Sequence, residues 1–197
     1  MKSSTIIFFL FTIIIILNGC TAVVVGGAVA GTAVALDNRT TGDYIEDQNI
    51  KSKFSHLFYQ DDNLKETHVN VTSYNRQVLI TGEVATAQQK QKLSQIANRI
   101  KNVRRYFNEV MIAKPSSMST RSNDSYITGK IKTTVFSKLK ELDGAQIKVV
   151  TENSSVYLMG LVSKKQADQI TEIVRTTHGV KRVIKLFEYP KPNDYRI

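Results

Sequence analysis

The chain has 197 residues and carries 27 Lys and Arg against 17 Asp and Glu, a formal net charge of +10. This basic balance indicates an anionic partner, either nucleic acid or an anionic membrane surface. A single cysteine excludes a disulfide within the chain, so the fold depends on its hydrophobic cores alone.

The N-terminus is typical of a lipoprotein signal peptide. One charge at Lys2 precedes the apolar run Ile6–Leu17, which is too short to cross a bilayer as a flanked helix. The following Gly19-Cys20 resembles a lipobox, in which the cysteine thiol receives a diacylglyceryl group and becomes the new N-terminus. We therefore predict a signal peptide over residues 1–19 and acylation of Cys20, palmitate included. The alternatives are ordinary secretory cleavage elsewhere, or an uncleaved anchor.

A tether is predicted over residues 20–43. Its apolar part consists of small residues, and Gly27 and Gly31 have the spacing of a transmembrane helix interface. Because the stretch is too short to span a bilayer, we favour a flexible segment near the membrane, closed by polar residues 37–43. A location in the cell envelope removes nucleic acid from reach, so an anionic phospholipid membrane becomes the expected partner.

The remaining sequence contains one module twice. VLITGEV (Val78–Val84) matches VYLMGLV (Val156–Val162), and both copies predict a helix, two strands, a helix and a final strand. The predicted boundaries are residues 44–113 for module 1, 114–124 for a linker, 125–192 for module 2 and 193–197 for a C-terminal tail.

The first helix of each module has apolar residues at helical spacing. In module 1 these are Ile50, Phe54 and Leu57, and Glu46-Asp47 lie near the helix start, where carboxylates favour the helix dipole. The equivalent face of module 2 is longer and is formed by Ile127, Ile131, Val135, Leu139 and Leu142.

The later elements carry turn, glycine and capping signals. Polar turns at residues 73–76 and 152–155 join the two strands, and Gly82 and Gly160 indicate a bulge or a close backbone approach. Each second helix begins with a capping box: Thr86 with Gln89, and Ser163 with Gln166.

These residues resemble the BON-domain family, whose pattern includes a strand ending in G-x-V and a final V-x-x-V strand. Gly82-Glu83-Val84 and Gly160-Leu161-Val162 match the first element, and Gly179-Val180 with Val183 matches the second. Module 1 has Asn102 in place of Gly179, and asparagine tolerates the left-handed backbone of a helix exit.

The resemblance implies an α+β fold with two tandem αββαβ modules, each a small three-stranded mixed sheet packed by two helices. With its lipobox and tether, the chain is similar to dual BON-domain outer-membrane lipoproteins associated with division and envelope stress. That family implies a protein on the periplasmic face of the outer membrane, anchored through Cys20, that binds phospholipid and supports envelope integrity. Thr21 favours outer-membrane sorting by the same analogy.

The first helix of module 2 carries the predicted lipid-binding residues. On a helical wheel Phe136 points about 120° away from the buried face. Lys132 and Lys140 lie four residues on either side, and Lys130 and Lys138 add charge nearby. An exposed aromatic between lysines suits an anionic bilayer, where each lysine contributes about 1 kcal/mol. The competing interpretation is that Phe136 packs against module 1 and the lysines are only solvated.

Other basic and aromatic residues have secondary roles in this prediction. Tyr126 and Ile127 are candidates for the contact between modules, while the dipeptides Arg104-Arg105 and Lys181-Arg182 rank second as headgroup contacts.

No catalytic constellation is predicted. His56, His68 and His178 lie in different elements with no spacing for a metal or a catalytic pair, and Asp61-Asp62 fit a surface turn. We therefore expect no enzyme, no metal and no cofactor. Two functions remain: a module that binds anionic phospholipid, or a lipid-anchored scaffold that docks an outer-membrane assembly or division protein.

Overall fold

The computed structural model describes residues 40–139 and 146–190. Both modules belong to one compact unit. The predicted signal peptide, Cys20, most of the tether, Lys140 and Leu142 lie outside the described residues. Among the residues that are described, none of the helices has the length and apolar character required to cross a membrane.

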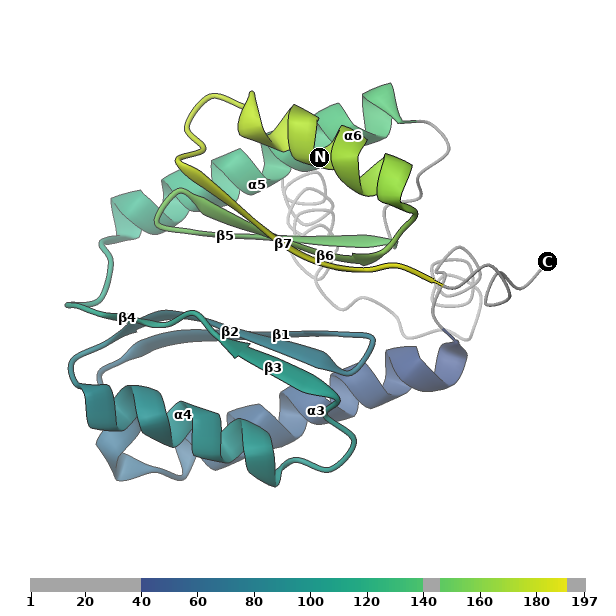
Figure 1. Ribbon diagram of the computed structural model, residues 1–197. Helices are drawn as coiled ribbons and strands as arrows, with labels where there is room; N and C mark the ends of the chain where they lie inside the picture. The colour runs from purple at the N-terminus through teal and green to yellow at the C-terminus, as the bar shows by residue number, and fades with distance from the viewer. Residues whose placement is uncertain (1–39, 140–145, 191–197) are drawn as a thin grey trace, which may run out of the picture. The chain divides into compact units, whose positions relative to one another are not determined.

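Module 1 runs in the predicted order. Its elements are α3 (Thr41–Tyr59), the short 3-10 helix η1 (Asp62–Leu64), β1 (His68–Tyr74), β2 (Gln77–Val84), α4 (Ala87–Arg99), β3 (Arg105–Asn108) and β4 (Met111–Ile112). Strand β2 lies at the centre, antiparallel to β1 and parallel to β3 and β4. Helices α3 and α4 cover one face of this sheet (Figure 1).

Module 2 repeats the arrangement. Its elements are α5 (Met118–Lys138), β5 (Ile147–Glu152), β6 (Ser155–Leu161), α6 (Lys164–Arg175) and β7 (Arg182–Glu188). Strand β6 is antiparallel to β5 and parallel to β7. The αββαβ order and the α+β class are thus confirmed in both modules. In module 1 the last strand is broken into β3 and β4, which gives a four-stranded sheet.

Both first helices begin earlier than the sequence predicts. Helix α3 begins at Thr41, within the predicted tether, and the Thr40 hydroxyl caps it by accepting from Asp43 N at 3.0 Å. Helix α5 begins at Met118, within the stretch predicted as linker, and is capped in the same way by Ser117. A serine-rich stretch resembles a linker in composition, but serine is also a preferred N-cap.

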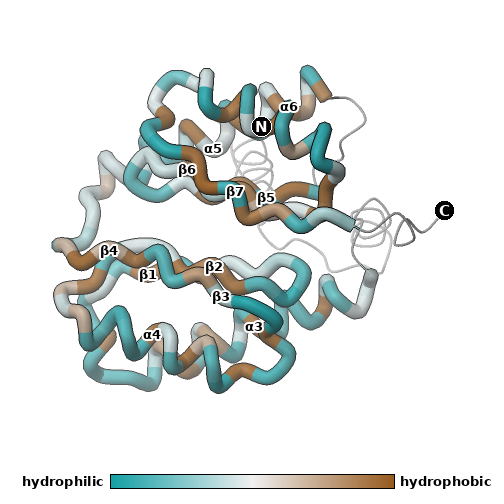
Figure 2. Tube along the Cα trace, viewed as in Figure 1, coloured by the Kyte–Doolittle hydropathy of each residue, from teal (hydrophilic) through white to brown (hydrophobic). Residues whose placement is uncertain are grey.

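Each module has its own core between its sheet and its helices (Figure 2). A third cluster lies on the helix-free faces and contains residues of both modules: Tyr74, Leu79, Tyr157 and Met159. All eight residues of β2 are therefore buried, because this strand contributes to a core on each of its faces. The two modules pack on each other through these faces.

The glycine, asparagine and capping predictions are confirmed. A Cβ on Gly82 would lie 1.9 Å from the His68 carbonyl oxygen, and one on Gly160 would lie 2.8 Å from that of Gln146. Asn102 and Gly179 both adopt positive φ, 69° and 94°, where the chain leaves the second helix. Both capping boxes form as predicted.

Candidate functional site

The structure corrects the predicted orientation of Phe136. Its side chain is half-buried and packs against the core of module 2, so it is neither a fully exposed wedge nor part of the cluster between modules. The reason is geometric: core residues four positions apart drift by about 40° per step around a helix. At Leu139, the core residue that caps the end of α5, the buried face has turned to within about 60° of Phe136.

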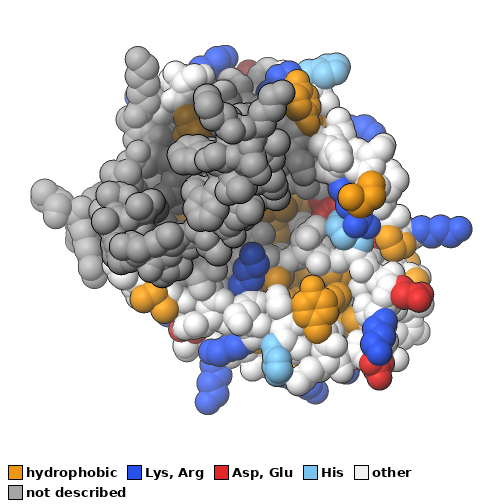
Figure 3. Space-filling view, turned by 180° about the vertical axis from the view of Figure 1, so that it is seen from behind, with side chains coloured by type: hydrophobic (Ala, Val, Ile, Leu, Met, Phe, Trp, Pro, Cys, Tyr) orange, Lys and Arg blue, Asp and Glu red, His pale blue; other side chains and the backbone are white. Residues whose placement is uncertain are grey.

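Tyr126 is instead the strongly exposed aromatic of α5. Its side chain is 67% exposed, whereas the neighbouring Ile127 is buried in the module 2 core. Lys130 lies one helical turn after Tyr126, and Lys130, Lys132 and Lys138 are all exposed. In the view of Figure 3, hydrophobic side chains lie scattered among lysines and arginines outside the grey area.

Arg104, predicted as a secondary headgroup contact, joins the two modules. It forms an ion pair with Glu188 of β7, and its Nε donates to the Asn75 carbonyl oxygen at 3.2 Å. Its neighbour Arg105 is exposed and lies over the ring of Phe107. Arg104 is therefore engaged in a contact between the two modules, while Arg105 remains an exposed charge.

A buried aspartate from the first helix holds the hairpin tip in each module. Asp47 accepts backbone hydrogen bonds from Asn75 N at 2.7 Å and Arg76 N at 2.8 Å. Asp124 accepts two equivalent bonds at 2.8 Å from the turn of module 2. Both turns have two residues at positive φ, the type I′ geometry of tight hairpins. Both aspartates therefore have a structural role. Asp47 holds a turn instead of acting on the helix dipole, and Asp124 lies in a helix instead of a linker.

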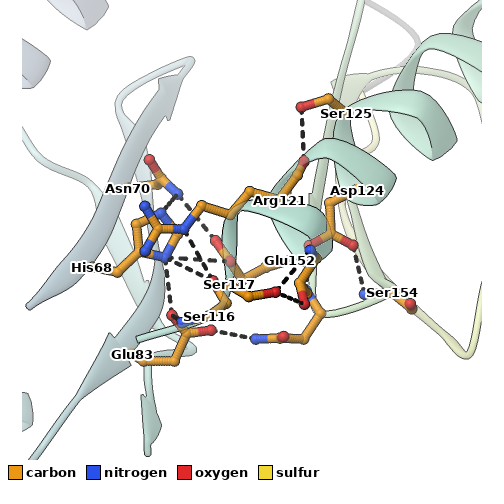
Figure 4. A network of polar contacts seen from close by, with 12 residues as sticks. His68, Asn70, Glu83, Ser116, Ser117, Arg121, Asp124, Ser125, Glu152 and Ser154 are labelled. Atoms are coloured by element: carbon orange, nitrogen blue, oxygen red, sulfur yellow. Dashed lines mark hydrogen bonds and ion pairs between the residues drawn. The ribbon is translucent and has the colours of Figure 1, made fainter. Parts of the chain in front are cut away.

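His68 lies in a polar cluster between the modules (Figure 4). Its Nδ1 is 2.9 Å from Glu83 Oε2 and 3.7 Å from Glu152 Oε1. His68 and Glu83 come from the paired strands β1 and β2, and Glu152 ends β5 of the other module. We refer to these three residues as the His68 cluster.

Amide groups surround the two carboxylates of the His68 cluster. Glu83 accepts from Ser116 N at 3.1 Å and from the Asn153 side-chain amide. Glu152 accepts from Asn70 Nδ2 at 3.1 Å. Glu83 is 1% exposed and Glu152 is 6% exposed, so each carboxylate depends on these donors in place of water.

The two carboxylates differ in their pKa. Burial raises the pKa of Glu152, and the nearby charge of Glu83 raises it further, so the net shift is upward. Burial also raises the pKa of Glu83, but the hydrogen bonds from Ser116, His68 and Asn153 outweigh this effect and lower it overall. The charge of the pair therefore resides preferentially on Glu83.

The sequence missed the His68 cluster because its members are far apart in the chain and belong to different modules. One signal was present. Glu83 is the one charged residue of its strand, at the position that Leu161 occupies in module 2. A charge in a buried strand requires a partner, and the packing of the two sheets supplies it.

Comparison with known proteins identifies both modules. The BON domain model matches residues 46–110 and 123–191. The chain is 35% identical over 178 residues to the outer membrane lipoprotein DolP of Haemophilus influenzae, covering 89% of this chain and 91% of the relative. It is 31% identical to a 21 kDa hemolysin of Actinobacillus pleuropneumoniae, over 78% and 79% of the two chains. Osmotically-inducible protein Y of Escherichia coli is 26% identical, over 78% of each chain.

The order of elements, the paired glycines and the close approach at each second strand agree with these matches. The chain belongs to the BON-domain family and carries two BON domains in tandem.

Proposed function

We propose that this chain is a lipoprotein anchored through Cys20 at the periplasmic face of the outer membrane, where its second BON domain binds anionic phospholipid. The similarity to an outer membrane lipoprotein over 89% of the chain supports this location, together with the lipobox-like sequence at Cys20. In this role the protein supports envelope integrity and acts at division sites. The proposal includes no catalytic residue.

The outward face of α5 is the observation that carries the lipid-binding proposal. One side of the helix is buried in the module core, while Tyr126 and Lys130 are exposed together, one turn apart, and Lys132 is exposed about 160° round the helix from Lys130. A tyrosine ring enters the membrane interface with its hydroxyl in water, and lysines extend their ammonium groups to phosphates. Phe136, Lys138 and Lys140 remain part of the predicted contact, with Phe136 limited to its exposed edge.

Co-sedimentation with vesicles tests this proposal. A fragment from Asp37 onward, without the acyl anchor, is mixed with neutral or anionic vesicles at low and high salt. We expect binding to anionic vesicles that weakens as salt rises, because the lysines act through screened charge. Replacing Tyr126 with Ala and Lys130 and Lys132 with Glu should abolish it.

The matched control reverses the same number of charges on another exposed site of module 2. Lys164→Glu with Lys165→Glu alters the N-terminal turn of α6, where acidic residues suit the helix dipole. This variant should keep its vesicle binding. Equal loss in both variants would mean that only net charge matters, and absence of binding by the unchanged fragment would leave membrane attachment to the acyl chains.

The second candidate function is a lipid-anchored scaffold that docks an envelope protein, such as an outer-membrane assembly component. Strand β4 supports it, because Met111 and Ile112 are 45% and 56% exposed on a short strand beside β2. An apolar strand of this kind suits the addition of a partner's strand. A scaffold should keep its cellular phenotype when the α5 variant has lost lipid binding.

A further inference from the structure

We propose that the His68 cluster binds one divalent transition-metal ion of the zinc class at the junction of the two BON domains. The cluster offers one imidazole nitrogen and two carboxylate oxygens, and these ligand atoms all lie within 4.8 Å of one another. This site is independent of the proposed lipid surface on α5.

The distances suit a small tetrahedral ion. Zinc binds imidazole nitrogen and carboxylate oxygen at about 2.0–2.2 Å, which places neighbouring ligand atoms roughly 3.3–3.5 Å apart. The two distances from His68 Nδ1 to Glu83 and Glu152, 2.9 and 3.7 Å, lie on either side of this value. The third separation, between the oxygens of Glu83 and Glu152, is at most 4.8 Å, so binding draws the two carboxylates toward each other as well as toward the ring.

The donor set selects the class of metal. Imidazole together with carboxylate suits zinc, nickel, copper or iron, whereas magnesium and calcium prefer oxygen ligands alone. The other ring nitrogen, His68 Nε2, lies 3.3 Å from the side-chain amide of Asn70. With a metal on Nδ1 the Nε2 atom carries a proton, and the Asn70 amide gives up its hydrogen bond to Glu152 when it turns its oxygen to accept that proton.

The arrangement of the ligands suits a dication. Two buried carboxylates face one imidazole, and a divalent ion bound between the three would match the charge of both carboxylates. The competing cation is Arg121, which is half-buried and donates from Nε to Ser116 Oγ at 3.3 Å. That hydroxyl lies 3.4 Å from His68 Nδ1 and is placed to serve as a fourth ligand (Figure 4).

The position of the His68 cluster determines how the ion enters from solvent and how its binding affects the two domains. The His68 side chain is 15% exposed, so the ring connects the cluster to solvent. His68 and Glu83 belong to the first domain and Glu152 to the second. A bound ion therefore holds the two domains together, and it raises the stability of the docked protein by mass action.

The test uses the full chain without a histidine tag, purified in a non-ionic detergent and stripped with EDTA. Calorimetric titration with Zn²⁺ should show one ion bound per chain. At a free concentration about 100-fold above Kd, Zn²⁺ should raise Tm by about 5 °C or more, while Mg²⁺ and Ca²⁺ leave it unchanged.

Two variants should abolish the Zn²⁺ titration and its Tm shift: His68→Asn, and Glu152→Gln, which keeps the shape of the side chain. The matched controls are His56→Asn and His178→Asn, which remove exposed histidines outside the cluster and should bind as the unchanged chain does. Should His68→Asn fail to fold, Glu152→Gln alone decides the question. No binding by the unchanged chain, or binding that persists in Glu152→Gln, would overturn the proposal.

Discussion

Tyr74 and Glu152 occupy the same place in their two domains, the last position of the first strand, and each contacts the other domain. The Tyr74 hydroxyl donates to the Gln146 carbonyl oxygen at 2.8 Å, and Glu152 Oε1 lies 3.7 Å from His68 Nδ1. Gln146 and His68 are themselves equivalent positions. The two copies thus meet with approximate two-fold symmetry, but one contact is a hydrogen bond from a phenol to a carbonyl oxygen and the other places a carboxylate beside an imidazole.

Gly82→Ala should strongly destabilise or unfold the protein. The new Cβ would lie 1.9 Å from a backbone oxygen of β1, at a φ of 116° that an L-residue rarely adopts. We expect a loss of at least about 3 kcal/mol in the free energy of unfolding, measured by urea titration. The control is Gly129→Ala in helix α5, where a Cβ meets no atom within 4 Å and alanine should add up to about 1 kcal/mol. Similar effects of the two changes would contradict the close-approach argument.

Asp47→Ala should remove the cap of the first hairpin. The variant leaves the amides of Asn75 and Arg76 without their acceptor in a buried turn, so we expect a loss of about 2–4 kcal/mol in urea unfolding. Asp168→Ala, on an exposed face of α6, is the control and should change stability by less than about 0.5 kcal/mol. A loss confined to about 0.5 kcal/mol in Asp47→Ala would show that water replaces the carboxylate.

The ion pair between Arg104 and Glu188 should couple the two domains weakly. The two side chains are 41% and 23% exposed, so solvent screens their attraction. A double-mutant cycle with alanine at both positions should give a coupling free energy of about 0.2–1 kcal/mol. The ion pair between Glu172 and Arg175 lies within helix α6. Its coupling free energy is the reference value for a pair that does not join the two domains. Zero coupling at Arg104 would mean that this junction contact is not maintained in solution.

Stability should fall in alkali because of Tyr157. Burial, reinforced by the negative charge of Glu109, raises the pKa of its hydroxyl above the ordinary value of about 10. The folded protein therefore holds the phenolic proton more tightly than the unfolded chain. This contribution is complete below about pH 10 and is lost as the pH rises through the folded pKa. Urea titrations between pH 9 and 11 should show a steeper decline for the unchanged chain than for Tyr157→Phe, and parallel curves would refute the assignment.

Local signals in the sequence were sufficient for the fold, because they act within one module. Thr86 with Gln89 forms the predicted capping box, and Gly82 marks the predicted close approach. Asn102 adopts the left-handed backbone expected of a glycine substitute. Each of these features depends on a few neighbouring residues and on backbone geometry, which the sequence encodes directly.

The site was harder to predict, since it depends on how elements meet. On a helical wheel Phe136 lies at a fixed angle from one buried face. In the structure the buried face turns around the helix along α5, so that the Phe136 ring also packs against the core. Asp124 seemed part of a polar linker because the Ser117 cap that starts its helix earlier was not recognised. Glu152 approaches His68 only when the two sheets pack together, and no pattern within one module contains that information.

The burial of β2 on both faces has a consequence for how the protein unfolds. Val78 and Ile80 contribute to the core under α3 and α4, while Leu79, between them, packs on the cluster shared with the second domain. Neither domain can expose its sheet without disturbing this strand. Denaturation should therefore follow one cooperative transition, not two, and the β2 amides should exchange their hydrogens only through global opening.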